Sequence, residues 1–350
     1  MLIRNKKDNK NINKQINLGI QFLRMILSFF IVIIHCLNQS YKKSYLIIFR
    51  LLGFYVPTFF ILSFYFSYNT FFLGHINRII IRFKRILIPY IIWPIIILIK
   101  NILIYYFYNN KAKLNIKMLL KSLYYQLLIG CGIHGIFWFL FNLILISLFI
   151  VIIIFMFKKN CFYILFLICL MIVILNYFNY INSFFSDYKY IVHHSIKPLS
   201  NSFIYATTGF YLASLEILTK FKVYRIKLLL FLFLLLLYII KYYSLINIKF
   251  QFLYNILIDI VGIWLILFFT LLPFDKIEKY FIKTFIIHIT NFTGGIYYLH
   301  PEVKLIFKNE LISINHGTFK GCILIYIISY LICFIGSKIF SKNSLIFLFI

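Results

Sequence analysis

The sequence predicts an all-α protein, a polytopic membrane helix bundle of about ten transmembrane helices with both termini in the cytoplasm. Two observations on composition lead to this prediction. Of the 350 residues, 63% are hydrophobic and 13% are charged, whereas soluble domains have roughly 45–50% apolar and about 25% charged residues. The apolar residues also come in runs of about 20, the length at which a helix crosses a bilayer. Such a composition excludes a water-soluble domain, a disordered chain and a disulfide scaffold.

Each predicted span is an apolar run of the required length. The ten runs are 20–37, 46–68, 86–108, 136–157, 161–181, 199–218, 223–240, 252–272, 290–308 and 320–341. The run 114–129 carries two lysines and predicts an amphipathic helix at the membrane surface, as does 275–287. We therefore expect three regions: a polar cytoplasmic leader (1–19), a single membrane domain (20–341) and a short tail (342–350).

The charge pattern predicts how these helices are oriented. A net charge of +28 arises from 36 Lys and Arg residues against 8 Asp and Glu residues, and the basic residues are scattered between apolar runs. This scatter is typical of charges that flank membrane helices and argues against a nucleic-acid partner. Alternate connections, counted from the leader, hold 20 basic residues against 13 in the other set. The richer set is expected on the cytoplasmic side of a multi-pass protein of the cell (inner or plasma) membrane.

Two ionisable residues lie within the first predicted span, where such side chains are costly and are by default functional hypotheses. Arg24 and His35 are eleven residues apart, which is close to three full turns. They therefore lie on one helix face, about 16 Å apart along the axis. With the leader inside, Arg24 lies near the cytoplasmic surface and His35 in the outer part of the bilayer. The spacing is equally compatible with a snorkelling arginine and a histidine satisfied by a neighbouring helix.

A basic cluster follows the second span. Arg82 and Arg85 are i,i+3 neighbours on one helical face. Guanidinium groups bind phosphate bidentately, so this pair can hold an anionic cofactor that arrives from the cytoplasm. Taken alone, the cluster is better explained as positive charge that fixes the orientation of the neighbouring helices in the membrane.

The six cysteines contain no CxxC pair and lie mostly in apolar runs, so we expect no metal site and no disulfide framework.

In chain order, these residues and several others resemble the membrane acyltransferase type-3 family. Arg24-x10-His35 resembles its signature in the first span, and Pro57-Thr-Phe-Phe-Ile-Leu-Ser63-Phe64 resembles its FF-x-x-Ser-Gly segment, with Phe64 in place of the glycine. Further similar segments are Arg82-x-x-Arg85 before Pro89-Tyr90, Trp138-Phe139-Leu140, Gly209-Phe-Tyr-Leu212 and Gly295-Ile-Tyr-Tyr-Leu-His300-Pro301. The matches run from about residue 20 to residue 301, and ten spans is the usual count of the family.

The resemblance implies an integral-membrane O-acyltransferase, an enzyme that moves an acyl group to a hydroxyl. The donor would be cytoplasmic acyl-CoA, commonly acetyl-CoA, and the acceptor a hydroxyl of an extracytoplasmic glycan or a similar molecule. No metal is implied. The partners would be acyl-CoA, a carbohydrate acceptor and the lipid bilayer, and the reaction would serve polysaccharide modification by acetylation.

The same resemblance suggests roles for individual residues. His35 is the candidate general base, because a neutral imidazole can take the proton of an attacking hydroxyl. Arg24, Arg82 and Arg85 are the candidate donor-binding residues. His300, about ten residues into the ninth span, is the second catalytic candidate, although it could equally cap backbone freed by the following Pro301.

Three further polar residues bear on that mechanism. Glu302 or Asp259 could hold an imidazole in one tautomer, as carboxylates do in catalytic triads. Ser63 is expected to be a helix-packing hydroxyl rather than a nucleophile.

The alternative function is a membrane transporter or flippase for a lipid-linked or anionic metabolite. The sequence lacks the inverted repeat that marks many secondary transporters. A glycan polymerase, the third possibility, usually has larger extracytoplasmic loops than these.

Overall fold

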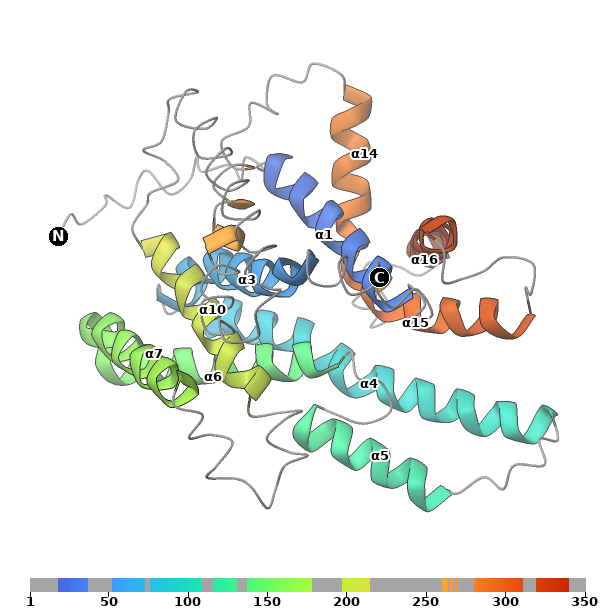
Figure 1. Ribbon diagram of the computed structural model, residues 1–350, viewed down its shortest axis with the longest axis horizontal. Helices are drawn as coiled ribbons and strands as arrows, with labels where there is room; N and C mark the ends of the chain where they lie inside the picture. The colour runs from blue at the N-terminus through green and yellow to red at the C-terminus, as the bar shows by residue number, and fades with distance from the viewer. Residues whose placement is uncertain are drawn as a thin grey trace.

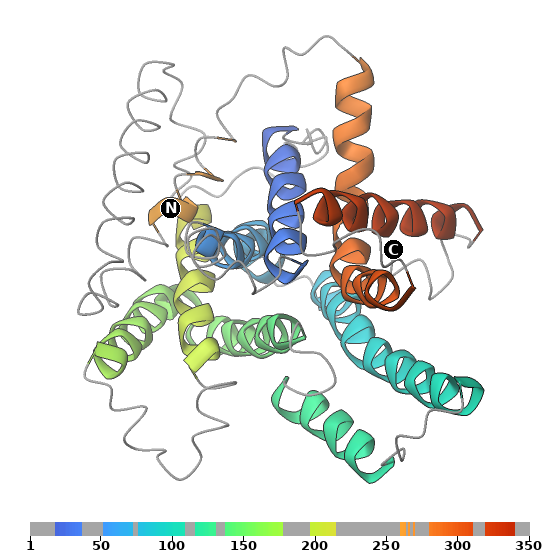
Figure 2. The same ribbon diagram turned by 45° about the vertical axis from the view of Figure 1, so that its right-hand side comes forward.

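The computed structural model is all-helical in the residues that it describes, namely 18–36, 52–72, 76–108, 116–130, 137–177, 197–214, 260–263, 265–266, 269, 280–310 and 319–339. Figures 1 and 2 show the arrangement from two directions. The described helices are α1 (Leu18–Cys36), α3 (Tyr55–Phe72), α4 (Ile76–Tyr108), α5 (Ile116–Ile129), α6 (Trp138–Phe157), α7 (Cys161–Tyr177), α10 (Lys197–Ser214), α14 (Tyr280–Asn291), α15 (Thr293–Glu310) and α16 (Phe319–Ile339). The prediction of an all-α protein is confirmed for this part of the chain.

Four of these helices are long and apolar enough to cross a membrane: α1, the Ile76–Leu103 part of α4, α6 and α16. A fifth apolar helix, Cys161–Leu175 within α7, is shorter. The protein is therefore a membrane protein with several apolar helices. Helices α3, α10 and α15 occupy three more of the predicted spans but are not among these four, and α15 carries charged residues such as Glu302 and Lys304. The count of ten spans and the orientation of the termini stay predictions.

Several predicted features lie outside the described residues. The span 223–240 is one of them, as are most of 252–272 with Asp259, most of the leader and the whole tail. The helix at 114–129 is observed as α5, whose Met118 and Tyr124 are exposed. The helix expected at 275–287 is observed in part as α14.

Helix α4 differs from its prediction in where it begins. The sequence predicts a connection over 69–85 followed by a span from residue 86, whereas the helix begins at Ile76 and runs unbroken for 33 residues through Pro89 and Pro94. A helix of that length extends about 50 Å, well beyond the roughly 30 Å of a hydrocarbon core. The arginines of the basic cluster therefore lie on the first three turns of a long helix instead of in a loop.

Helices α3 and α10 cross at very short range. A Cβ atom built on Gly209 of α10 would lie 2.2 Å from the carbonyl oxygen of Ile61 on α3, so only glycine fits at this point. Phe64, which stands where the resembled family has glycine, is fully buried and packs its ring against that of Phe71. Small residues let membrane helices approach closely, and at this crossing the small residue is the glycine on α10.

Helix α1 lies at the boundary of two apolar clusters. Ile20, Leu23 and Leu27 pack into a cluster with residues of α3, α4, α6 and α10. Val32, Ile33 and Cys36 instead pack with residues of α15 and α16. In Figure 2 α1 (dark blue) lies between α3 and α10 on one side and α15 and α16 on the other. The face of α1 that is left between the clusters carries the polar residues described next.

Candidate active site

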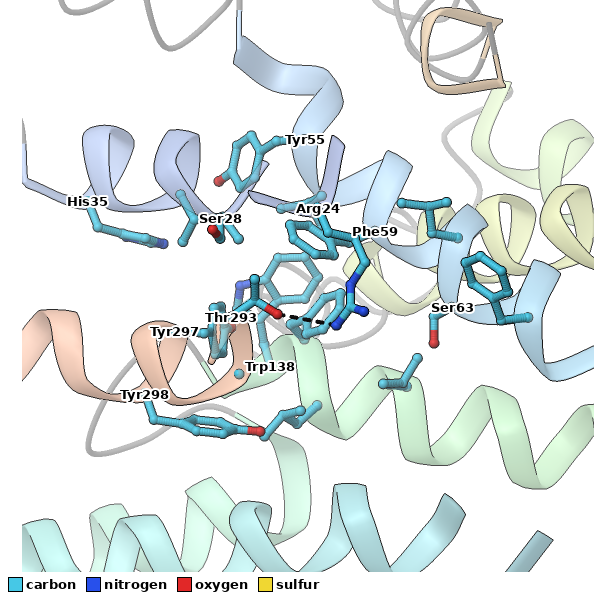
Figure 3. Close-up of a pocket in the computed structure, with 18 of the residues that line it drawn as sticks. Arg24, Ser28, His35, Tyr55, Phe59, Ser63, Trp138, Thr293, Tyr297 and Tyr298 are labelled. Carbon is cyan, nitrogen blue, oxygen red and sulfur yellow. Dashed lines mark hydrogen bonds between the residues drawn. The ribbon is translucent and has the colours of Figure 1, made fainter. Parts of the chain in front are cut away.

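A cavity of about 370 Å³ opens where α1, α3, α4, α6 and α15 meet. Figure 3 shows the side chains that surround it. Polar groups line it at several points, and aromatic rings, among them Phe59, Trp138 and Tyr297, form much of the remaining wall. Among the residues that the structure describes, the lining includes no Asp or Glu, and its charged residues are arginines. Such a cavity favours an anionic ligand with an apolar part.

One face of α1 contributes four of the lining residues: Arg24, Ser28, Ile31 and His35. Their spacings of four, three and four residues place them in a row along one side of a helix. The structure thus brings Arg24 and His35 onto the same cavity, as the eleven-residue spacing indicates. In Figure 3 His35 lies at one end of the drawn group and Arg24 further along.

Arg24 is fixed by two hydrogen bonds. Its Nη2 donates to Oγ1 of Thr293 at 3.2 Å, and its Nη1 donates to Oε1 of Gln21 at 3.2 Å. Thr293 is the first residue of α15 and in turn donates to the carbonyl oxygen of Thr290 at 3.0 Å. The first turn of α15 therefore orients the guanidinium toward the cavity. Gly294, which also lines it, faces open space, because a Cβ there would meet nothing within 4 Å.

Arg82 reaches the same cavity from α4. Its Nη2 donates to Oγ of Ser63 at 2.9 Å, and its guanidinium carbon lies 5.3 Å from the ring centre of Phe71 and 5.8 Å from that of Phe64. Its Nε is buried and has no hydrogen-bond partner among the described residues. The aromatic rings hold the guanidinium by cation–π contact and leave donors free for a ligand.

Arg85 does not join Arg82 in this site. It is exposed on α4 and does not line the cavity. The two residues are i,i+3 neighbours, as predicted, yet packing against α3 turns only Arg82 inward. The second cation of the cavity is Arg24. The phosphate-binding pair suggested by sequence proximity is therefore separated, and the pair that faces one cavity is Arg24 and Arg82.

The two candidate catalytic histidines, His35 and His300, lie next to each other at the end of the cavity away from the arginines (Figure 3). The ring centroids of His35 and His300 are 5.3 Å apart. His300 is fully buried, and its Nδ1 lies 3.2 Å from the carbonyl oxygen of Ile296. Because a carbonyl only accepts, this contact assigns the proton to Nδ1 and leaves Nε2 as an acceptor. That Nε2 has no hydrogen-bond partner among the described residues. His35 lines the cavity and His300 stands behind it.

Glu302 is not the partner of either imidazole. Its carboxylate forms an ion pair with the ammonium of Lys100 on α4. The suggestion that Glu302 holds an imidazole in one tautomer is therefore wrong for this arrangement, since residue 302 projects from α15 about 200° away from residue 300. Asp259, the other suggested carboxylate, lies outside the described residues.

Some site residues carry no recognisable sequence signal. Thr293 binds Arg24, and Lys304 donates its ammonium hydrogen to the carbonyl oxygen of His35. The one hint for Lys304 is its position four residues after His300, which places both on one face of α15. Ser63, expected as a helix-packing hydroxyl rather than a nucleophile, accepts the Arg82 hydrogen bond between α4 and α3 and also lines the cavity.

Comparison with known proteins adds one finding. A family model described as an acyltransferase domain matches residues 17–341, nearly the whole chain. The match includes every residue of the cavity described above. No curated protein and no solved structure matches.

Proposed function

Because the chain belongs to the membrane acyltransferase type-3 family, we propose that it is an integral-membrane O-acyltransferase of the cell membrane. It moves an acyl group from cytoplasmic acyl-CoA to a hydroxyl of an extracytoplasmic glycan or a similar acceptor, and acetyl is the acyl group that we propose. The observation that carries the proposal is one cavity with guanidinium groups from Arg24 and Arg82 and the imidazole of His35 on its wall.

The cationic residues suit the donor. Coenzyme A carries phosphates at one end of a long pantetheine arm and the thioester at the other. Guanidinium groups bind phosphate through paired hydrogen bonds, and the lining offers two of them, with no carboxylate among its described residues. Arg24 and His35 lie about 16 Å apart along α1, so an extended donor held at Arg24 and Arg82 reaches toward the imidazole. Arg85 is exposed on α4 and lies outside the lining of the cavity.

The imidazole suits the chemistry of transfer. The acceptor oxygen attacks the thioester carbonyl carbon while His35 takes the hydroxyl proton. The carbon–sulfur bond then breaks, the new ester leaves with the acceptor, and the proton on His35 returns to the thiolate to give free coenzyme A. His300, buried behind His35 with an acceptor nitrogen that no described residue bonds, is the second imidazole of this centre.

The test is transfer of radiolabelled acetyl from acetyl-CoA by the purified protein in lipid nanodiscs. Extracted surface polysaccharide serves as the acceptor, and the acetyl thioester of an acyl-carrier protein serves as a competing donor. We expect alkali-labile label on the glycan, with the His35→Ala variant at least about 100-fold slower, since general-base catalysis contributes roughly 10²–10⁴-fold. His288→Gln is the matched control, because His288 does not line the cavity. Its Nδ1 lies 2.8 Å from the hydroxyl oxygen of Tyr330, with which it forms a hydrogen bond.

The result also separates the proposal from its alternative. A transporter or flippase moves its substrate into or out of sealed vesicles without covalent change. Vesicle flux of a lipid-linked sugar with no acetyl transfer from either donor would therefore overturn the enzymatic proposal.

A further inference from the structure

Lys304 makes a contact that none of the motifs accounts for. Its ammonium group donates a hydrogen bond from α15 to the main-chain carbonyl oxygen of His35 on α1, 269 positions away in the chain. The lysine is half-buried and does not line the cavity. It forms no ion pair with a carboxylate among the described residues, since Glu302, two positions earlier, pairs with Lys100. The cation is therefore directed at the backbone of α1.

This contact ties α15 to the backbone of α1 at a sensitive position. His35 is next to Cys36, the last described residue of α1. A lysine ammonium donates a charge-assisted hydrogen bond to a carbonyl oxygen, which is stronger than a bond between neutral groups. The bonded carbonyl belongs to the same residue whose imidazole faces the cavity. A hydrogen bond that holds this carbonyl group also restricts the direction in which the His35 side chain leaves the backbone.

The same face of α15 also holds the ring of His35. His300 and Lys304 are i,i+4 neighbours on that helix, so their side chains project in nearly the same direction. The His300 ring lies 5.3 Å from the His35 ring while Lys304 holds the His35 carbonyl. One helix face thus contacts the residue at two points, its ring and its backbone.

We propose that Lys304 is a positioning residue for acyl transfer, which acts by holding the backbone of His35 so that the imidazole meets the acceptor hydroxyl. The inference rests on the proposed function. It assigns no contact between Lys304 and either substrate. Loss of the hydrogen bond should therefore slow turnover without weakening donor binding.

The experiment compares Lys304→Met, which removes the donor group, with Lys304→Arg, which keeps it. Both are purified in nanodiscs and assayed for acetyl transfer over a range of acetyl-CoA concentrations. We expect kcat of Lys304→Met to fall about tenfold to a hundredfold, because a displacement of about 1 Å in a catalytic group can cost that much. Its KM for acetyl-CoA should stay within about twofold, and Lys304→Arg should recover most of kcat. Lys338→Met, on an exposed residue of α16, is the matched control.

The possible results separate the two proposals. Unchanged kcat in Lys304→Met would overturn the positioning role, and so would a rise in KM that equals the loss of kcat/KM. If Lys304→Met fails to fold, Lys304→Arg decides: normal acetyl-CoA binding with kcat still lowered to the level of His35→Ala contradicts the role, and near-normal kcat supports it. Absence of transfer in the unsubstituted protein counts against the proposed function instead.

Discussion

The Nη2 atom of Arg82 lies 2.9 Å from Oγ of Ser63 and donates a hydrogen bond to it. This bond joins α4 to α3 at the cavity wall and fixes the guanidinium between that hydroxyl and the rings of Phe64 and Phe71. A serine oxygen that accepts from Arg82 still has its own hydrogen to donate. Arg82 and Ser63 together therefore present several donors to a ligand from two helices that pack on each other.

Arg82→Ala and Arg85→Ala should differ sharply, because only Arg82 lines the cavity. A charge-assisted hydrogen bond contributes about 1.5–3 kcal/mol, so Arg82→Ala should raise KM for acetyl-CoA by about tenfold or more. Arg85→Ala, the matched control, should change it less than about threefold. Steady-state kinetics in nanodiscs measure both values, and equal effects of the two substitutions would contradict the separation of these arginines.

Gly294→Leu should block the cavity, because the glycine lines it and faces open space. A leucine side chain there occupies volume that the donor needs, so transfer should fall strongly while the protein stays folded. Gly294→Ala adds one carbon only and should keep most of the activity, with stability raised by up to about 1 kcal/mol from helix propensity. Acetyl-CoA binding and thermal unfolding measure the two effects. Full activity of Gly294→Leu would show that the donor does not occupy this part of the cavity.

Gly209→Ala should destabilise the bundle rather than the chemistry. The added Cβ would lie 2.2 Å from the Ile61 carbonyl oxygen, so α3 and α10 must move apart. Overpacking of this kind costs about 1–3 kcal/mol. Thermal unfolding in detergent should show a clearly lower midpoint than for Gly294→Ala, the same substitution at an open site. Equal midpoints for the two variants would mean that the helix crossing is looser than described.

Glu302→Gln tests whether this carboxylate belongs to the site. The residue pairs with Lys100, which is 34% exposed, so its loss should lower the free energy of unfolding by about 1–2 kcal/mol. The kcat of the folded enzyme should stay within about twofold. Adding Lys100→Met should restore part of the stability, because no unpaired ammonium then remains. A fall in kcat of tenfold or more in Glu302→Gln, with normal stability, would show that Glu302 does act on one of the imidazoles.

Helix periodicity explains which site residues the sequence can predict. The angle between residues eleven apart on one helix is fixed by backbone geometry, so the spacing alone assigns Arg24 and His35 to one face. The same holds for the all-α class, because the hydrophobic runs are long and nearly free of charge. Local geometry of this kind does not depend on which helices become neighbours.

Tertiary packing decides the rest. Arg82 and Arg85 carry the same charge in the same segment, and only the burial of one side of α4 against α3 separates them. The partners of Thr293, Glu302 and Lys304 are 269, 202 and 269 positions away, respectively, and no local pattern specifies such pairings. The early start of α4 escapes prediction because a basic stretch that precedes a proline is also typical of a loop.

The row of cavity residues on α1 limits how this stretch of chain can change in length. One residue inserted between Arg24 and His35 would rotate one relative to the other by about 100° and carry either the guanidinium or the imidazole into an apolar cluster. Insertions that complete whole turns, such as seven or eleven residues, or a deletion of seven, would restore the angle but shift the two groups along the axis by about 10 Å or more. Natural variants of this enzyme should therefore keep the interval itself unchanged, even where residues within it are substituted.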